Sequence, residues 1–540
     1  MNFAAAAALL AAILSGTTLP LLAADSPDTS DADSDSSAKE FAASIERFNA
    51  RDPQSPDTLN ARLSYAIFLA KIKDRNCQTR LDSAQNQLDL AKANPALGVV
   101  LPAGLARLSA AEYQVHWARA ACRGSEPRDA EFRNAELRAA LESARRAVEL
   151  YRGAFDAVSM VTMQFNASVA YHDLGDSAAA VSALQEAITM DREYGYADDA
   201  EDNYALLLQW KDEDASPDQV AARMIDFPER SATLAFGWFP SVTEVNVESD
   251  YTQVADGEVL SVHSTRSAQR RVRKSLTSWR VSFQAAPAHF DLANPPSKDP
   301  ALQGLATSLA GMLLQFHDFE LARNGDFDSA KGGFKFGSRV RADVNELTRD
   351  YLASRGTPPT AQFIRSVSKA LSAQLSPDVI ESLVAENFNF DTGTWIGATL
   401  EQGVWYNMMA SLSLPLEPQV FVWHEIEFAY TRPVPCLRDA KETACIEIVL
   451  HATPDPAILG EMLKVLARSS RLPRGQLPQL QAITHMRLIV DPITSVAYRR
   501  DVLRYSYWSD GAAAPNHALT ESEKTSIVSS SLPSADGSRH

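Results

Sequence analysis

The feature that most constrains the fold is a change in the spacing of apolar residues at about Phe227. Before this point, apolar side chains recur every three or four residues, which places them on one face of an α-helix. After it, several segments alternate apolar and polar residues, as half-buried β-strands do. A chain of 540 residues is also too long for one hydrophobic core. We therefore expect an all-α domain over residues 41–226 and an α+β domain over residues 227–510.

The clearest helical unit is Val161–Asp191, which reads as two short helices joined by a turn at Gly175. Small residues at Ala180 and Ala187 allow the two backbones to approach closely, and Leu184 fills the space beside them. Helical segments on both sides bring the total to about four hairpins, enough for each to bury its apolar face on its neighbours. An ordinary antiparallel helix pair is the alternative interpretation.

The same unit resembles a tetratricopeptide repeat (TPR). The residues at the matching spacings are Tyr171, Gly175, Asp176, Ala180 and Ala187. Three features of the repeat pattern are missing, because Gln164 replaces its Trp, Ala167-Ser168 replaces its Leu-Gly, and Arg192 replaces its Pro.

The resemblance implies a TPR-like helical-hairpin solenoid, whose inner face commonly binds peptide segments. First helices line that face, so the candidate partner-binding residues are Gln164, Asn166 and Asn203. The alternative is that these three amides simply face solvent. We expect a protein or peptide partner on the helical domain.

Within residues 227–510, alternating segments lie on both sides of a helical stretch at Pro300–Val384. This order predicts one curved antiparallel sheet with helices packed on its concave side. The flanking segments have different compositions. Residues 25–40 are acidic and rich in Ser, so we expect a disordered linker, and residues 511–540 are expected to form a disordered tail.

The first residues of the chain resemble a secretory signal. Ala4–Leu14 is apolar, Pro20 interrupts it, and Ala23-Ala24 offers small residues for cleavage. We predict a signal peptide over residues 1–24, with an uncleaved membrane anchor as the alternative. No later stretch has the apolar length of a membrane helix, so we expect a periplasmic or secreted protein without a membrane span after cleavage.

The four cysteines fall into two pairs, Cys77 with Cys122 and Cys436 with Cys445. An even number of cysteines in an exported protein favours disulfides. The three possible connectivities remain open, although the domain interpretation favours pairing within each half. Four buried free thiols are the alternative.

The overall charge limits the classes of partner. The formal net charge is −17, and such a chain is repelled by phosphate backbones, so we expect no nucleic-acid partner. The hydrophobic content of 45% and charged content of 22% are ordinary for globular proteins.

No motif for catalysis or cofactor binding is recognisable. The chain lacks a Gly-x-Ser-x-Gly elbow, a phosphate-binding loop and a dinucleotide-binding glycine cluster. His424-Glu425 begins like a zinc-protease motif, but the fifth position is Phe428 and the segment alternates like a strand. The sequence therefore predicts no cofactor and no metal site, and it leaves the catalytic residues unknown.

These observations favour a non-enzymatic, exported scaffold or adaptor that binds protein through a TPR-like domain, joined to an α+β domain of unknown role. An alternative is a carrier for an apolar small molecule, because aromatic residues are dense in the α+β domain. A further alternative is a secreted hydrolase. Its first candidate residues would be His424, Glu425, His451 and Asp455.

Overall fold

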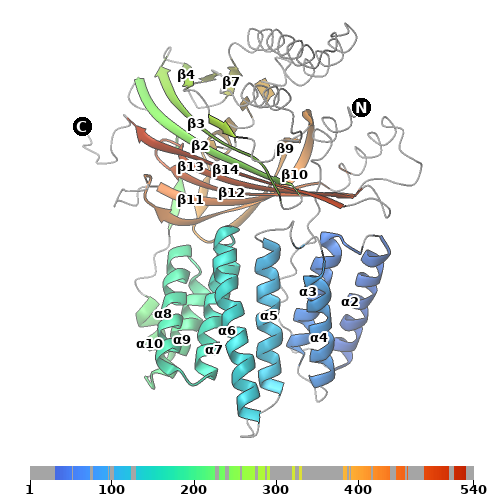
Figure 1. Ribbon diagram of the computed structural model, residues 1–540. Helices are drawn as coiled ribbons and strands as arrows, with labels where there is room; N and C mark the ends of the chain where they lie inside the picture. Colours follow the sequence, from blue (N-terminus) through green and yellow to red (C-terminus); the bar gives the residue numbers. More distant parts are fainter. Residues whose placement is uncertain are drawn as a thin grey trace.

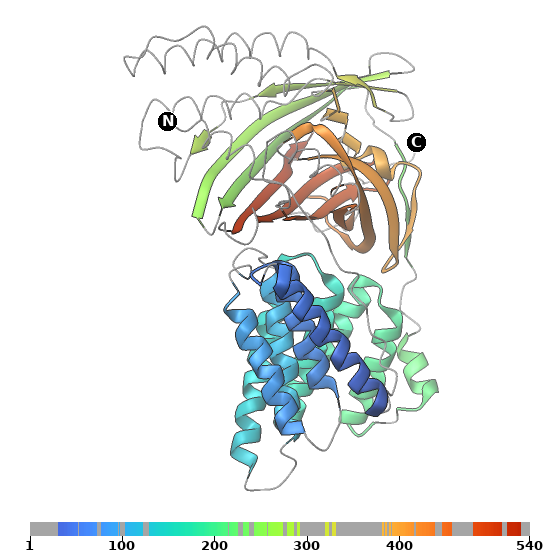
Figure 2. The ribbon, with the colours of Figure 1, turned by 90° about the vertical axis from the view of Figure 1, so that its right-hand side faces the viewer.

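A helical array lies beneath a large curved antiparallel sheet (Figures 1 and 2). The computed structural model describes residues 31–51, 53–72, 77–94, 97, 103–122, 129–213, 215–224, 230–236, 242–255, 258–273, 278–285, 289–291, 319–322, 327–330, 381–382, 384–385, 388–389, 391–414, 417–437, 445–455, 459, 479–509 and 516–530.

The array consists of helices that pack mainly against their neighbours in the chain. They are α2 (Asp31–Arg51), α3 (Pro56–Lys71), α4 (Cys77–Lys92), α5 (Ala103–Cys122), α6 (Ala130–Gly153), α7 (Ala157–Asp173), α8 (Ser177–Tyr194), α9 (Ala197–Trp210) and α10 (Pro217–Met224). The expected helical domain is therefore present, and the turn at Gly175 separates α7 from α8 as predicted.

Local sequence signals fix several helix ends. Ser55 caps α3 by accepting the Thr58 N–H, and Asp156 and Asp176 cap α7 and α8 in the same way. Gly195 ends α8 with φ +82°, a left-handed conformation that disfavours any other residue.

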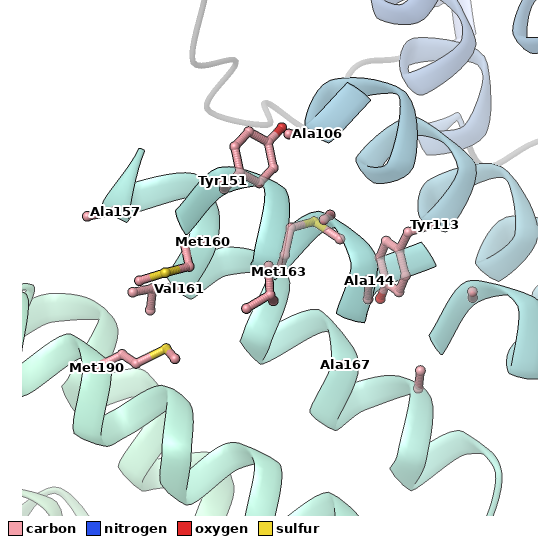
Figure 3. Close-up of a cluster of buried hydrophobic side chains, with 14 of the residues drawn as sticks. Ala106, Tyr113, Ala144, Tyr151, Ala157, Met160, Val161, Met163, Ala167 and Met190 are labelled. Atoms are coloured by element: carbon pink, nitrogen blue, oxygen red, sulfur yellow. The ribbon is translucent and has the colours of Figure 1, made fainter. Parts of the chain in front are cut away.

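Small side chains hold the middle of the array together (Figure 3). Ala140, Ala144 and Ala147 form a fully buried stripe on α6, which lets neighbouring helices approach closely. Larger side chains such as Tyr113 and Met163 fill the remaining space. The core of the array thus depends on the alternation of small and large residues.

The main sheet is antiparallel and follows the order β7-β6-β4-β3-β2-β14-β13-β12-β11-β10-β9, with β5 paired to β3. Its strands are β2 (Val242–Ala255), β3 (Glu258–Arg273), β4 (Ser278–Ala285), β5 (His289–Asp291), β6 (Phe319–Ala322), β7 (Phe327–Ala330), β9 (Trp405–Leu414), β10 (Glu417–Val434), β11 (Cys445–Pro454), β12 (Gln479–Asp491), β13 (Val496–Ser509) and β14 (Asn516–Ser530). Two short strands, β1 (Ser231–Thr233) and β8 (Thr399–Glu401), pair separately. A short 3-10 helix, η3 (Gly393–Trp395), precedes β8.

The two faces of the sheet have different roles. The core face carries a buried apolar cluster that includes Ile426, Ile448 and Leu488. The array-facing face carries residues that touch the helices, such as Arg432 and Arg487. Because successive strand residues point to opposite faces, one strand serves both surfaces.

The prediction of disorder is wrong in part for residues 511–540 and for residues 25–40. Residues 511–540 contain β14, which pairs with both β13 and β2 in the middle of the sheet. Its sequence is largely polar, so the strand depends on pairing at both edges rather than on its own propensity. Within residues 25–40, α2 begins at Asp31.

The predicted helical stretch Pro300–Val384 also needs correction, because it contains the strands β6 and β7. Most of the remaining stretch, and the predicted signal peptide at residues 1–24, lie outside the described residues. Among the helices that the structure describes, none combines the length and apolar character needed to cross a bilayer.

Both predicted disulfides are confirmed. Cys77 and Cys122 join the start of α4 to the end of α5, with Cα atoms 5.9 Å apart. Cys436 and Cys445 join the end of β10 to the start of β11, at 5.0 Å. Each half of the chain is therefore cross-linked within itself.

Replacing each pair of cysteines with alanine should destabilise the protein by different amounts. The loop-entropy relation gives about 4 kcal/mol for Cys77–Cys122 and about 3 kcal/mol for the shorter loop of Cys436–Cys445. Urea unfolding of the two double variants measures the difference. A larger loss from the Cys436–Cys445 pair would contradict the expectation that loop length sets the order.

A second prediction concerns the turn after α8. A Cβ added at Gly195 would lie 3.1 Å from the backbone of Gln402, whereas one at Gly175 would meet nothing within 4 Å. Both glycines have positive φ, so alanine at either position strains the backbone by roughly 1–2 kcal/mol. Gly195→Ala should cost roughly 1–3 kcal/mol more, because it also disturbs packing against the sheet. Thermal unfolding of both variants tests this, and equal losses would argue against it.

Candidate functional site

A hollow lies at the C-terminal end of the helical array and is lined by residues of α8, α9 and α10. Figure 1 shows these three helices next to one another. We call the hollow the terminal groove. Its volume is about 740 Å³. Its lining residues are Gln185, Ile188, Thr189, Arg192, Glu193, Tyr204, Leu207, Leu208, Lys211, Glu213, Arg223 and Arg230.

The floor of the groove is the apolar seam between α8 and α9. Ile188, Leu207 and Leu208 are at most 6% exposed, so the groove reaches down to buried side chains. In a stacked array, each helix pair is covered by the next one. Here the last helix, α10, has only 8 residues, and the seam stays open beside it.

The rim of the groove is cationic. Arg192, Lys211, Arg223 and Arg230 face two carboxylates, Glu193 and Glu213. Glu193 is engaged by Arg432 of the sheet at 3.2 Å. Among the described residues, Lys211, Arg223 and Arg230 form no ion pair. A cationic surface therefore lies over an apolar floor within a chain of net charge −17.

The three partner-binding candidates from the sequence do not meet in one site. Gln164 is buried on α7 and donates a hydrogen bond to Glu186 at 3.0 Å. Asn203 is buried on α9 and donates one to Asp191 at 2.8 Å. The amide of Asn166 lies 3.5 Å from the sulfur of Met163 on the same helix. Gln164 and Asn203 are thus used in contacts between helices.

The candidate residues for a hydrolase are also separated. His424 is buried, and its Nδ1 lies 2.8 Å from the Val422 carbonyl oxygen, whereas Glu425 is exposed on the opposite face of β10. His451 pairs in register with Glu427, and Asp455 follows the end of β11. Within the described part of the chain, no group of three or more His, Cys, Asp or Glu side chains is arranged to hold a metal ion.

Sequence reasoning missed the terminal groove because its cations come from several elements. Arg192 lies on α8, Lys211 follows α9, Arg223 lies on α10 and Arg230 precedes β1. None of them belongs to a cluster of basic residues in the sequence. One signal was available in the sequence. A helix of only 8 residues, α10, follows α8 and α9 and leaves part of their shared apolar seam open.

A second, smaller cavity of about 210 Å³ lies between helix ends of the array and the sheet. On its wall, Arg432 contacts Glu447 and Glu193 at 3.2 Å each and lies over the Tyr194 ring at 5.0 Å. Arg487 lies over the Phe155 ring at 4.9 Å. Each arginine thus joins the sheet to a helix end.

Comparison with known proteins gives little support for any assignment. No family model matches the sequence, and no curated protein matches it. A solved structure titled "Lipid-protein interactions in lipovitellin" has a TM-score of 0.28 and 6% identity, over 56% of this chain and 27% of that chain. The match thus spans about a quarter of that chain, and a TM-score of this size carries no argument about function.

The two helices that wall the groove are held together by a buried polar pair. Asp191 on α8 is fully buried, and one carboxylate oxygen accepts the hydrogen bond from Asn203 on α9. The other oxygen, Oδ1, has no partner among the described residues. Burial raises the pKa of Asp191 from 3.8 to about 7, although the Asn203 hydrogen bond opposes the shift.

This raised pKa predicts a pH-dependent stability. The folded protein binds a proton that the unfolded chain releases, so stability should rise as the pH falls from about 7 toward 4. Asp191→Asn should remove this dependence and stabilise the protein above pH 7, on the order of 2 kcal/mol. Urea unfolding across this pH range is the measurement, with exposed Asp198→Asn as the control. An unchanged pH profile in Asp191→Asn would refute the assignment.

Proposed function

We propose that this protein is an exported, non-enzymatic scaffold whose terminal groove binds an extended protein segment with acidic and apolar side chains. The observation that carries the proposal is the cationic rim over an apolar floor. The proposal also treats the helices before Phe227 as a degenerate TPR-like solenoid, in line with the resemblance of Val161–Asp191 to that repeat.

Charge complementarity selects the partner. The groove lining holds four cations and two carboxylates, one of which is paired with Arg432. The chain as a whole is strongly acidic, so an acidic segment is attracted best to a local cationic surface. Acidic side chains would therefore guide a segment to the groove, and apolar side chains would hold it on Ile188 and Leu207.

Export is the second part of the proposal. Two disulfides are consistent with an oxidising compartment. Together with the signal-like residues 1–24, they support a periplasmic or secreted location. A scaffold in such a compartment meets extended segments of other exported proteins.

The alternative of an apolar-ligand carrier has less support. The rings of Trp395, Tyr406 and Phe428 pack on one another, and Trp395 is only 1% exposed. These rings cover apolar residues of the core face in the described part of the sheet. The aromatic density that suggested a carrier thus contributes to a packed core there, which favours the groove as the binding site.

Charge reversal at the rim should test the proposal directly. The probe is a short synthetic peptide of alternating Glu and Leu, and fluorescence anisotropy measures its binding. The double variant Lys211→Glu/Arg223→Glu should bind about tenfold more weakly or worse, because two favourable contacts become repulsive.

The matched control is Arg138→Glu/Arg145→Glu, which makes the same change in net charge at exposed positions of α6. It should retain most of the affinity, and a peptide of alternating Lys and Leu should not bind the groove. Equal weakening in the two double variants, or no binding by the native protein, would overturn the proposal.

A further inference from the structure

Three polar aromatic side chains form a cluster on the array-facing face of the sheet. His451 on β11 pairs in register with His485 on β12, and their rings are 4.6 Å apart in an edge-to-face arrangement. Tyr505 on β13 lies 5.9 Å from His485, also edge to face. We call these residues the histidine cluster.

Several polar atoms of the cluster are buried without hydrogen bonds. Nε2 of His451, both ring nitrogens of His485 and the hydroxyl oxygen of Tyr505 each have almost no solvent contact. None of these atoms has a hydrogen-bond partner among the described residues. His485 is 6% exposed and Tyr505 is 4% exposed. The neutral rings therefore pack as aromatic groups, and no described residue accepts a hydrogen bond from these ring nitrogens that would stabilise an added proton.

The turn between α6 and α7 covers this part of the sheet. Phe155 in this turn has φ +60°, which is unusual for a bulky residue, and its ring packs on Arg487 at 4.9 Å. The carboxylate of the next residue, Asp156, is close enough to His451 to raise the pKa of its ring. Its Oδ1 already accepts the Ser159 N–H at 3.0 Å. The strained turn thus brings the array against the histidine cluster.

Asp156 favours an imidazolium on His451, but the other charged groups around the cluster are held in ion pairs or exposed. On β12, Arg487 shares the array-facing face with His485, and on β13 Asp501 is paired with Arg487 and Arg499. On β11, Glu447 contacts Arg432 of β10 and Arg487. Glu427 of β10 pairs in register with His451 but is exposed. On β9, Trp405 packs on His451 at 5.4 Å. The nearby buried carboxylates are therefore already held by arginines.

We propose that the His451–His485 pair is a proton-operated latch between the helical array and the sheet. While both rings are neutral, they pack against each other and the α6–α7 turn stays docked. A proton on either ring places a cation in an enclosed site near Arg487. No described residue accepts a hydrogen bond from the buried ring nitrogens there. Separation of the array from this face of the sheet exposes the charged ring to water.

The direction of the pH effect follows from the burial of both rings. Burial lowers the pKa of His451 below its ordinary value of 6.5, although Asp156 opposes the shift. Burial lowers the pKa of His485 much further, and the nearby His451 adds to this effect. The separated state binds the proton more readily than the docked state. Docking is therefore complete above about pH 6.5 and weakens as the pH falls below it.

The latch can be tested without a peptide in the terminal groove. It acts at the α6–α7 turn, whereas the groove lies among α8, α9 and α10. A peptide-binding failure would leave the latch intact, and a protein without a pH-dependent opening could still bind a peptide.

The experiment follows the full-length protein from about pH 7.5 to pH 5 by small-angle X-ray scattering and by hydrogen exchange corrected for intrinsic rates. The native protein should expand reversibly as the pH falls. Exchange in the α6–α7 turn should rise, with the docking equilibrium shifting by up to about tenfold per pH unit for each proton bound. Absence of any expansion would overturn the proposal.

Two variants distinguish opening caused by the histidine pair from opening caused by Asp or Glu side chains. His451→Phe/His485→Phe keeps the aromatic packing and should remove the opening across this pH range. His172→Phe, on an exposed ring stacked on Trp210, is the matched control and should open like the native protein. If the double variant opened as much as the native protein, the opening would come from Asp or Glu residues, and this would refute the latch.

A measurement on the native protein covers the case in which the double variant does not fold. Histidine ring signals in NMR report the titration of each imidazole while the array is docked. His485 should stay neutral until the opening occurs. Protonation of His485 near its ordinary value without exposure of the α6–α7 turn would refute the latch.

Discussion

The structure depends on the docking of helix ends onto one face of a curved sheet. Arg432 is central to this contact, because it joins Glu447 of its own sheet to Glu193 and Tyr194 at the end of α8. Arg432 is half-buried and lies between two carboxylates, so loss of the buried Glu447 would leave its charge partly unpaired. The contact therefore fixes the position of α8 relative to the sheet, and with it one wall of the terminal groove.

Backbone geometry reinforces this contact. Gly195 ends α8, and Gly403 follows β8, and both have positive φ. A Cβ on Gly403 would lie 3.0 Å from the carbonyl oxygen of Gly195, so the two chain segments approach more closely than side chains allow. The side-chain amide of Gln402 donates hydrogen bonds to the carbonyl oxygens of Glu193 and Thr431. Close backbone approach and side-chain hydrogen bonds thus act at the same helix end.

Sequence periodicity predicted those parts of the fold whose local patterns agree with their tertiary contacts. The alanine stripe on α6 has helical spacing and is buried as such, and the strand at Val242–Ala255 alternates as expected. The strand Asn516–Ser530 could not be predicted in this way, because a polar strand held at both edges has little pattern of its own. Sequence periodicity also could not locate the groove or the His451–His485 pair, since their residues meet only when distant elements pack.

The two proposed functional features occupy neighbouring parts of one contact surface, and this has a mechanical consequence. Glu193 lines the groove and also binds Arg432, while Arg487 lies between the histidine cluster and Phe155. Glu447 lies within ion-pair distance of both arginines. Separation at the α6–α7 turn would therefore weaken the partners of Arg432 and release Glu193 toward the groove. An additional carboxylate there would lower the groove's attraction for an acidic segment, so proton binding at the sheet would oppose peptide binding at the array.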